Sequence, residues 1–159
     1  MERMVKCSWR WAVLACATAM ACRHPAALEG DVAPLIHAAV LRYEAKQFMA
    51  GERLPTCIRI HGHAGESVAA VRDALHQSLP DVRAAEACAI VEGDVYLAGS
   101  RVPAVLLTSG PIRWIAADEV EVAGGFERTR SSTSRPTYRV VRDGGRWVCL
   151  GPVVTGVPL

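Results

Sequence analysis

Three cysteines downstream of residue 22 have the plainest chemistry in this chain. Cys57, Cys88 and Cys149 would meet an oxidising compartment if the chain is exported, and an odd number leaves one thiol unpaired. We expect a Cys57–Cys88 disulfide, which would close a loop of about 30 residues and stabilise the fold by roughly 3 to 4 kcal/mol in the chain-entropy model. Cys149 is then a buried thiol. A pairing through Cys149 and the absence of any disulfide stay open, because spacing does not fix connectivity.

Histidine spacing suggests one metal-ligating pair. His61 and His63 are two residues apart at the end of an expected strand, so both imidazoles can share a face and ligate zinc. Glu66 and His76 are the conceivable further ligands. A zinc site needs three or four ligands, and only the first two have suitable spacing. We therefore predict no metal site and interpret the segment as a polar loop between a strand and a helix.

The remaining sequence lacks the motifs of common enzymes. The serines have no G-x-S-x-G elbow, the cysteines lack the local signature of a catalytic nucleophile, and neither a phosphate-binding loop nor a dinucleotide fingerprint occurs. We expect no catalytic residue and no cofactor, and a binding protein rather than an enzyme.

An arginine-rich stretch over residues 124–136 is the most unusual polar segment. We expect a long loop between two strands, with Phe126 at its base and Arg128, Arg130 and Arg135 along it. Guanidinium groups bind carboxylates and phosphates in a bidentate manner. These four residues are our candidate surface for an acidic protein or anionic head groups. The alternative is a solvated, mobile tip, because long loops are either functional or disordered.

The N-terminus has the pattern of a secretory signal. Arg3, Lys6 and Arg10 precede an apolar run over residues 11–21. The run is too short to span a bilayer, which needs about 20 apolar residues. We therefore predict that residues 1–21 are a signal peptide and are not part of the folded domain.

The end of this segment resembles the box of small residues before the lipid-bearing cysteine of bacterial lipoproteins. Ala19-Met20-Ala21-Cys22 fits it best, and Val13-Leu14-Ala15-Cys16 fits it as an alternative. The resemblance implies an acylated Cys22, with Cys16 as the second choice, and a membrane anchor. Since Arg23 rather than Asp follows, it implies the periplasmic face of the outer membrane. Ordinary cleavage after Ala21 would instead leave a soluble periplasmic protein.

Charge argues against a nucleic-acid partner. The sequence has 18 Lys and Arg and 16 Asp and Glu, and three of these bases and one acid lie in residues 1–21. The remainder holds 15 of each, without the positive excess that is typical of nucleic-acid binders. We expect residues 22–30 to be a tether and residues 31–159 to be a single domain, since this length is sufficient for one core.

Hydrophobic periodicity predicts the elements of the domain. Helical spacing after Asp31 predicts a first helix, and a second apolar stripe predicts another over residues 66–79. Between them, alternation predicts a strand over residues 57–61, with Ile58 and Ile60 facing the core. Further strands are expected over residues 87–91, 95–98, 104–108, 112–116 and 119–123, followed by a hairpin over 137–150 that turns at Asp143-Gly144-Gly145. Helices followed by strands indicate an α+β fold, with both helices packed on one face of an antiparallel, strongly curved sheet of about five or six strands.

The final hairpin carries the pattern Tyr-x-Val-x-x-x-Gly-Gly-x-Trp-Val over residues 138–148. With the preceding elements it resembles the cone-shaped fold of the nuclear-transport-factor-like and SnoaL-like families. Residues 109–126 also resemble a set of uncharacterised exported bacterial proteins of lipoprotein type. The resemblance implies a basin between sheet and helices, where enzymatic members place an Asp/His pair. We expect no acid on an inward face here.

These expectations converge on a small, exported binding or interaction module of the bacterial cell envelope. Its predicted partners are the membrane, through a lipid anchor, and an envelope protein. The alternatives are a periplasmic immunity or inhibitor protein, and a cone-fold enzyme or small-ligand carrier.

Overall fold

The computed structural model describes residues 26–49, 51–61 and 66–153. The helices are α1 (Ala26–Phe48), α2 (Glu66–Leu75) and the short 3-10 helix η1 (Ala85–Ala87). The strands are β1 (Thr56–Ile60), β2 (Val82–Ala84), β3 (Cys88–Val91), β4 (Asp94–Leu97), β5 (Val105–Ala116), β6 (Glu119–Thr129), β7 (Ser132–Ser134), β8 (Thr137–Asp143) and β9 (Arg146–Pro152). None of the described helices is both long and apolar enough to cross a membrane.

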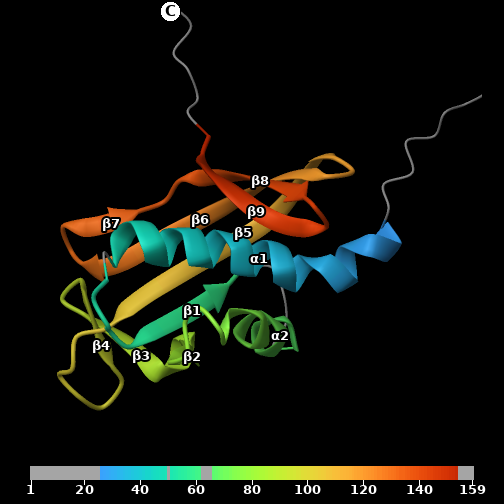
Figure 1. Ribbon diagram of the computed structural model, residues 1–159. Coiled ribbons are helices and arrows are strands. Elements are labelled where there is room, and N and C mark those ends of the chain that lie inside the picture. Colours follow the sequence, from blue (N-terminus) through green and yellow to red (C-terminus); the bar gives the residue numbers. More distant parts are fainter. Residues whose placement is uncertain (1–25, 50, 62–65, 154–159) are drawn as a thin grey trace, which may run out of the picture.

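Two sheets organise these strands (Figure 1). The larger has seven strands in the order β2-β1-β5-β6-β8-β9, with β7 paired to β6, and β3 and β4 form a separate antiparallel pair. The predicted α+β class is confirmed. The predicted sheet was wrong in detail: it is larger than expected, mixed, and not strongly curved. β1 pairs in parallel with both β2 and β5. The crossover through α2 allows the first of these pairs, and the segment from η1 to β4 carries the chain back before β5 begins.

Several element boundaries differ from the predictions. The first helix begins at Ala26, inside the expected tether over residues 22–30. β5 is one strand where two were expected, because the register shifts between Ser109 and Ile112 and the strand continues through Pro111. Proline is tolerated at such a bulge, where the ladder is already interrupted.

The arginine-rich stretch is not the long loop that we expected. β6 continues through Phe126 and Arg128 to Thr129, and the chain turns directly into β7. The two strands pair from Phe126 opposite Ser134 to Thr129 opposite Ser132. Threonine, which occurs at positions 129 and 133 of this ladder, is enriched in strands. The segment is therefore held in a hairpin, which fixes where its arginines point.

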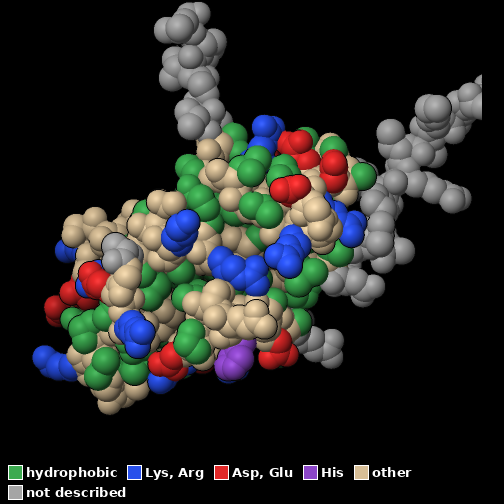
Figure 2. Space-filling model, in the orientation of Figure 1, with side chains coloured by type: hydrophobic (Ala, Val, Ile, Leu, Met, Phe, Trp, Pro, Cys, Tyr) green, Lys and Arg blue, Asp and Glu red, His purple; other side chains and the backbone are tan. Residues whose placement is uncertain are grey.

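α1 lies across one face of the large sheet with α2 beside it, in agreement with the predicted packing (Figure 1). In the same orientation, Lys and Arg side chains are spread over this face among hydrophobic and neutral ones, without forming one continuous patch (Figure 2). The helix buries its inner face against β5, β6 and β9. Its position decides which side chains are enclosed between helix and sheet.

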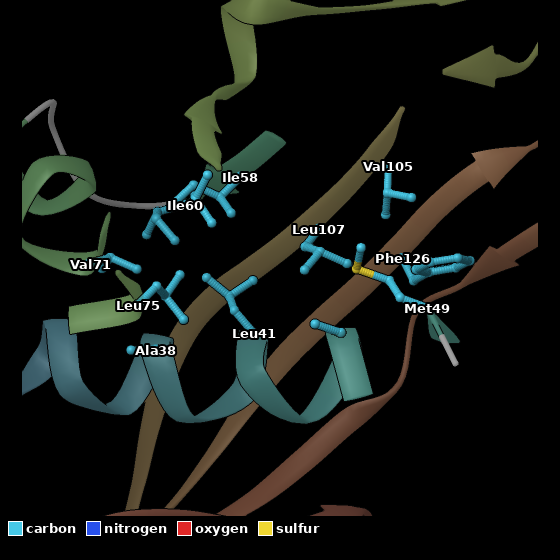
Figure 3. Packing of buried hydrophobic residues seen from close by; sticks show 12 residues of the cluster. Ala38, Leu41, Met49, Ile58, Ile60, Val71, Leu75, Val105, Leu107 and Phe126 are labelled. Atoms are coloured by element: carbon cyan, nitrogen blue, oxygen red, sulfur yellow. The ribbon is translucent and has the colours of Figure 1, made fainter. Parts of the chain in front are cut away.

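The main core lies where α1, α2, β1 and β5 meet (Figure 3). Ile58 and Ile60 face it, as predicted, and Val71 and Leu75 contribute the buried stripe of α2. Phe126 closes one end of this core. Each fully buried aliphatic side chain contributes roughly 1.5 to 3 kcal/mol, so this cluster fixes the helices on the sheet.

A second cluster continues the core under the first half of α1. Trp114 of β5 and Trp147 of β9 meet edge to face, with ring centroids 5.7 Å apart. Val120, Val140 and Tyr138 pack around them from β6 and β8. One face of the final hairpin thus forms a wall of the core, while Val148 and Leu150 on its other face are exposed.

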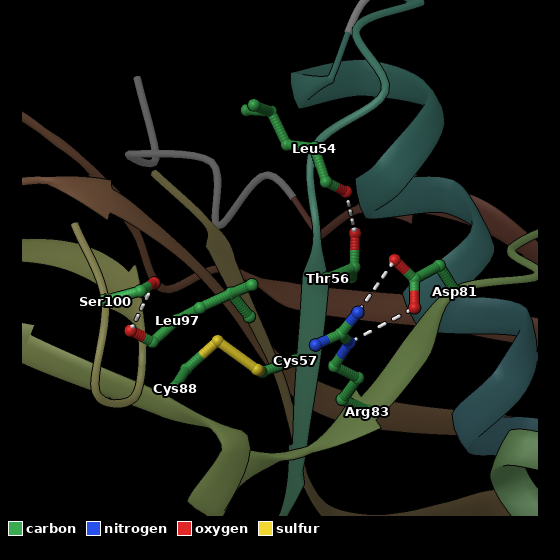
Figure 4. Close-up of a disulfide and its surroundings, with 8 residues drawn as sticks. All are labelled: Leu54, Thr56, Cys57, Asp81, Arg83, Cys88, Leu97 and Ser100. Atoms are coloured by element: carbon green, nitrogen blue, oxygen red, sulfur yellow. Dashed lines mark hydrogen bonds and ion pairs between the residues drawn. A yellow bond between two sulfur atoms is a disulfide. The ribbon is translucent and has the colours of Figure 1, made fainter. Parts of the chain in front are cut away.

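The predicted disulfide is present on the opposite face of the sheet. Cys57 of β1 and Cys88 of β3 are bonded, with their Cα atoms 6.2 Å apart (Figure 4). The bond tethers the β3–β4 pair over β1, where Val95 and Leu106 complete a third apolar cluster. Cys149 is the free thiol among the described cysteines, and its partial burial raises its pKa to about 11.

Candidate functional site

An open groove of about 920 Å³ lies beside the C-terminal end of α1. Its walls are the last two turns of α1, the segment that leads from α1 into β1, and the chain that follows α2. Ala45, Met49, Leu54 and Leu79 make its floor apolar. A floor of this kind can bury the apolar side chains of a ligand.

Three cations lie around this floor. Arg42 and Lys46 project from α1 and Arg53 from the following segment. Arg42 is held in place because it donates to the carbonyl of Ala74 and, at 3.2 Å, to the hydroxyl of Ser78. The side chains of Lys46 and Arg53 make no ion pair or hydrogen bond within the described residues.

The acids of the groove are already neutralised. Glu52 forms an ion pair with Arg128 at 2.8 Å, and Asp81 pairs with Arg83 at 3.1 Å, the latter drawn in Figure 4. The groove therefore presents positive charge that no neighbouring carboxylate offsets. We define it by its cations Arg42, Lys46 and Arg53 and call it the basic groove.

Local sequence explains how the groove forms. Residues 42, 45, 46 and 49 share one face of α1, because residues three or four apart are neighbours on a helix. Gly51 takes a φ of +86°, which few other residues adopt, and lets the chain leave the helix sharply. The hydroxyl of Thr56 donates to the carbonyl of Leu54 at 3.1 Å and fixes the last part of the segment (Figure 4).

The predicted partner-binding residues separate in space. Phe126 is only 4% exposed and stacks on Phe48, with ring centroids 4.7 Å apart, so it belongs to the core. Arg128 reaches the basic groove through Glu52. Arg135 pairs with Glu127 at 3.0 Å on the other face of the sheet. The backbone N–H of Arg130 donates to Asp94 of β4. The three arginines therefore do not form a single surface.

The structure describes only one of the two predicted weak metal ligands, His61. His61 lies exposed at the end of β1, and His76 is exposed just after α2. His63 lies outside the described residues. Among residues 26–49, 51–61 and 66–153, no three His, Cys, Asp or Glu side chains are placed to hold a metal ion. Cys16 and Cys22, the predicted lipid sites, also lie outside the described part of the chain.

A buried polar pair between helix and sheet was missed by the sequence analysis. His37 of α1 and Ser109 of β5 are both fully buried, and Nδ1 of the histidine lies 2.8 Å from the serine hydroxyl. This is a His/Ser contact of the kind that activates a nucleophile. Neither residue lines the basic groove.

Glu44 is a second buried polar residue that sequence reasoning missed, and it contradicts our expectation of no inward acid. Burial raises its pKa to about 8, while Tyr138 and the Gly125 backbone lower it by less. Neither carboxyl oxygen of Glu44 has a hydrogen-bond partner within the described residues. The contacts of Glu44 with Tyr138 and with the Gly125 backbone are therefore close approaches rather than hydrogen bonds of standard geometry. His37 and Glu44 are seven residues apart, two helical turns, and flank Val40 on the apolar face. This spacing of two polar residues on the apolar face of the helix is the sequence signal that could have revealed them.

Comparison with protein-family models, with curated protein sequences and with solved structures finds no match to this chain. Fold and site together define a small α+β protein with a seven-stranded mixed sheet, a disulfide-tethered hairpin and a basic groove. Its function is therefore argued from its own geometry.

Proposed function

We propose that this protein is a small binding module of the bacterial cell envelope, anchored through a lipid on Cys22, which holds an acidic, amphipathic peptide segment of a partner protein in the basic groove. The observation that carries the proposal is the combination of an apolar floor with cations that no acid offsets.

Charge supports an acidic occupant. Lys46 and Arg53 have no counter-ion among the described residues, and the groove's carboxylates, Glu52 and Asp81, are engaged by Arg128 and Arg83. A ligand carboxylate placed beside the cations gains attraction without having to displace an acid of the protein. Complementary charge of this kind raises association rates and suppresses wrong partners.

Shape supports a peptide segment. The groove is open along α1 from Arg42 to Met49, a length of roughly 10 Å at 1.5 Å per residue. Its volume lies near the upper end of the range of about 300 to 1,000 Å³ that is typical of small-ligand pockets. An extended or helical segment can lay apolar side chains on Met49 and Leu79 while its carboxylates reach the rim. Arg128 of the predicted arginine surface contributes indirectly, because it pairs with Glu52 and offsets the charge of that acid at the rim.

Selection from a random peptide display library against the immobilised protein tests the proposal. We expect the selected peptides to combine Asp or Glu with aliphatic or aromatic residues, to compete with one another, and to bind more weakly as salt rises. Affinity is then measured by fluorescence anisotropy for the wild type and for the Lys46→Glu/Arg53→Glu variant, which should bind about tenfold more weakly or worse.

The matched control is Arg101→Glu/Arg146→Glu, which makes the same charge change at two exposed positions outside the groove. Its affinity should remain near that of the wild type. Selection of basic peptides, or equal losses in both variants, would remove the groove as the binding site.

A further inference from the structure

A second cavity, of about 330 Å³, lies on the sheet face opposite α1. Arg59 lines it from β1 and His61 from the position just after this strand, and Thr108 lines it from β5, directly opposite Arg59 in the parallel register. Their neighbours Ile58 and Ile60 point to the core on the α1 side, because successive residues of a strand face opposite ways.

Charge in this cavity is positive. The side chain of Arg59 is half-buried and makes no ion pair within the described residues. Glu127 is the acid among the lining residues, and Arg135 already binds it at 3.0 Å. No acid therefore offsets the positive charge of the Arg59 guanidinium group. Because the site is partly enclosed, solvent screens this charge less than on an open surface.

Hydrogen-bond donors converge on the same space. The guanidinium of Arg59 supplies several N–H groups and the His61 imidazole at least one. The hydroxyl of Thr108 makes no hydrogen bond to another described residue and is free to donate. Arg59 and Thr108 are paired on two neighbouring strands, and the backbone N–H of His61 donates to the carbonyl of Ser109 at 2.8 Å, so all three are tied to the edge of the same strand pair.

Small residues keep the cavity open. Gly110 and Ala123 line it, and a Cβ on Gly110 would lie 2.9 Å from the Cβ of Ala123. Gly125 makes room for Thr108, since a Cβ there would lie 2.2 Å from the threonine hydroxyl oxygen. A larger side chain at these positions would fill the space or displace the donors.

We propose that this cavity binds a phosphate group, with Arg59 as the principal ligand and His61 and Thr108 as additional donors. A planar guanidinium matches phosphate oxygens in a bidentate geometry, and charge-assisted hydrogen bonds of this kind are the strong ones. The volume is at the small end of ligand pockets, which suits a phosphate with a short organic group attached. The site is separate from the basic groove and does not depend on it.

Titration of the 15N-labelled protein, produced from the full chain, tests the site. Inorganic phosphate and glycerol phosphate are added at constant ionic strength, with chloride as the reference anion. We expect saturable shifts of the backbone amides near Arg59, His61 and Thr108 with both phosphates and none with chloride. Shifts that do not saturate, or that chloride reproduces, would overturn the proposal.

Variants assign the binding to Arg59. Arg59→Gln should weaken phosphate binding at least tenfold. Arg59→Lys should weaken it less, because lysine keeps the positive charge but lacks the bidentate geometry of the guanidinium group. Arg101→Gln, at an exposed position outside the cavity, is the control and should bind like the wild type. The amide spectrum of Arg59→Gln shows whether this variant is folded. If it is folded and binds phosphate as tightly as the wild type does, the site is excluded.

A third experiment, with lipid vesicles, distinguishes a lipid head group from a soluble phosphate compound. Vesicles containing phosphatidylglycerol are sedimented with the wild type and with Arg59→Gln. Co-sedimentation that Arg59→Gln loses, beside saturable binding of glycerol phosphate, identifies a lipid head group. Saturable phosphate binding without such co-sedimentation identifies a soluble phosphate compound.

Discussion

The carboxyl group of Glu44 on α1 lies against the ring of Tyr138 on β8, in a niche that exists because residue 124 of β6 is glycine. A Cβ at Gly124 would lie 2.4 Å from the Tyr138 ring and 2.6 Å from Oε1 of Glu44. The niche removes the carboxyl from water, which raises the pKa of Glu44 to about 8 and also raises the pKa of Tyr138. Helix and sheet therefore enclose an acid that is mostly protonated at neutral pH.

Glu44→Gln should abolish part of the pH dependence of stability. The folded pKa of Glu44 is raised above its unfolded value near 4.5, so the folded state holds this proton more tightly. Its contribution is therefore greatest at low pH and is lost as pH rises through the window from about 4.5 to 8. The wild type should lose up to about 1.4 kcal/mol per pH unit within the window relative to Glu44→Gln, whose amide does not titrate.

Urea unfolding at pH 5, 6, 7 and 8 measures this difference. Both proteins share all other titrating groups, so the difference between their curves isolates Glu44. Parallel curves across the window would mean that Glu44 is ionised in the folded protein or is not buried.

Removal of the disulfide should destabilise the protein strongly. Cys57 and Cys88 are 31 residues apart in sequence, and Cys57→Ala/Cys88→Ala should lower the free energy of unfolding by roughly 3 to 4 kcal/mol. Cys149→Ala is the control that removes a thiol without a cross-link. Peptide mapping without reductant should recover the 57–88 pair, and alkylation of Cys57 in unreduced protein would contradict it.

Gly125→Ala should be destabilising because the new Cβ meets the Thr108 hydroxyl oxygen at 2.2 Å. Overpacking of this kind costs about 1 to 3 kcal/mol. Thr108→Ala removes the obstructing oxygen, so the double variant Thr108→Ala/Gly125→Ala should recover most of the loss. A double-mutant cycle from thermal unfolding gives the coupling energy, and strictly additive effects would show that the clash is relieved in another way.

Lipidation is predicted at Cys22 rather than at Cys16. Intact mass of protein extracted from the membranes of its bacterial host should show acyl chains on a chain that begins at Cys22. Cys22→Ser should abolish the acyl mass, and Cys16→Ser should leave it unchanged. An unmodified chain that begins at Cys22, recovered from the periplasm, would replace the anchored module with a soluble one.

Much of the secondary structure was readable from local patterns. Alternation placed Ile58 and Ile60 on the core side of β1, and the glycine turn at 144–145 set the final hairpin. Cysteine usage predicted the Cys57–Cys88 pair. These signals are local because side-chain periodicity and turn conformation depend on residues that are near one another in sequence.

Local sequence patterns predict an α+β domain with helices on one face of a sheet, and they favour the Cys57–Cys88 disulfide without fixing that pairing. The tertiary fold sets β1 parallel to β5, buries Phe126 in the core and directs Arg128 and Arg135 to opposite faces of the sheet. It also enclosed Glu44 beside Tyr138, 94 positions along the chain. Strand order and buried polar contacts join distant residues, and their energies depend on burial that no local pattern of residues specifies.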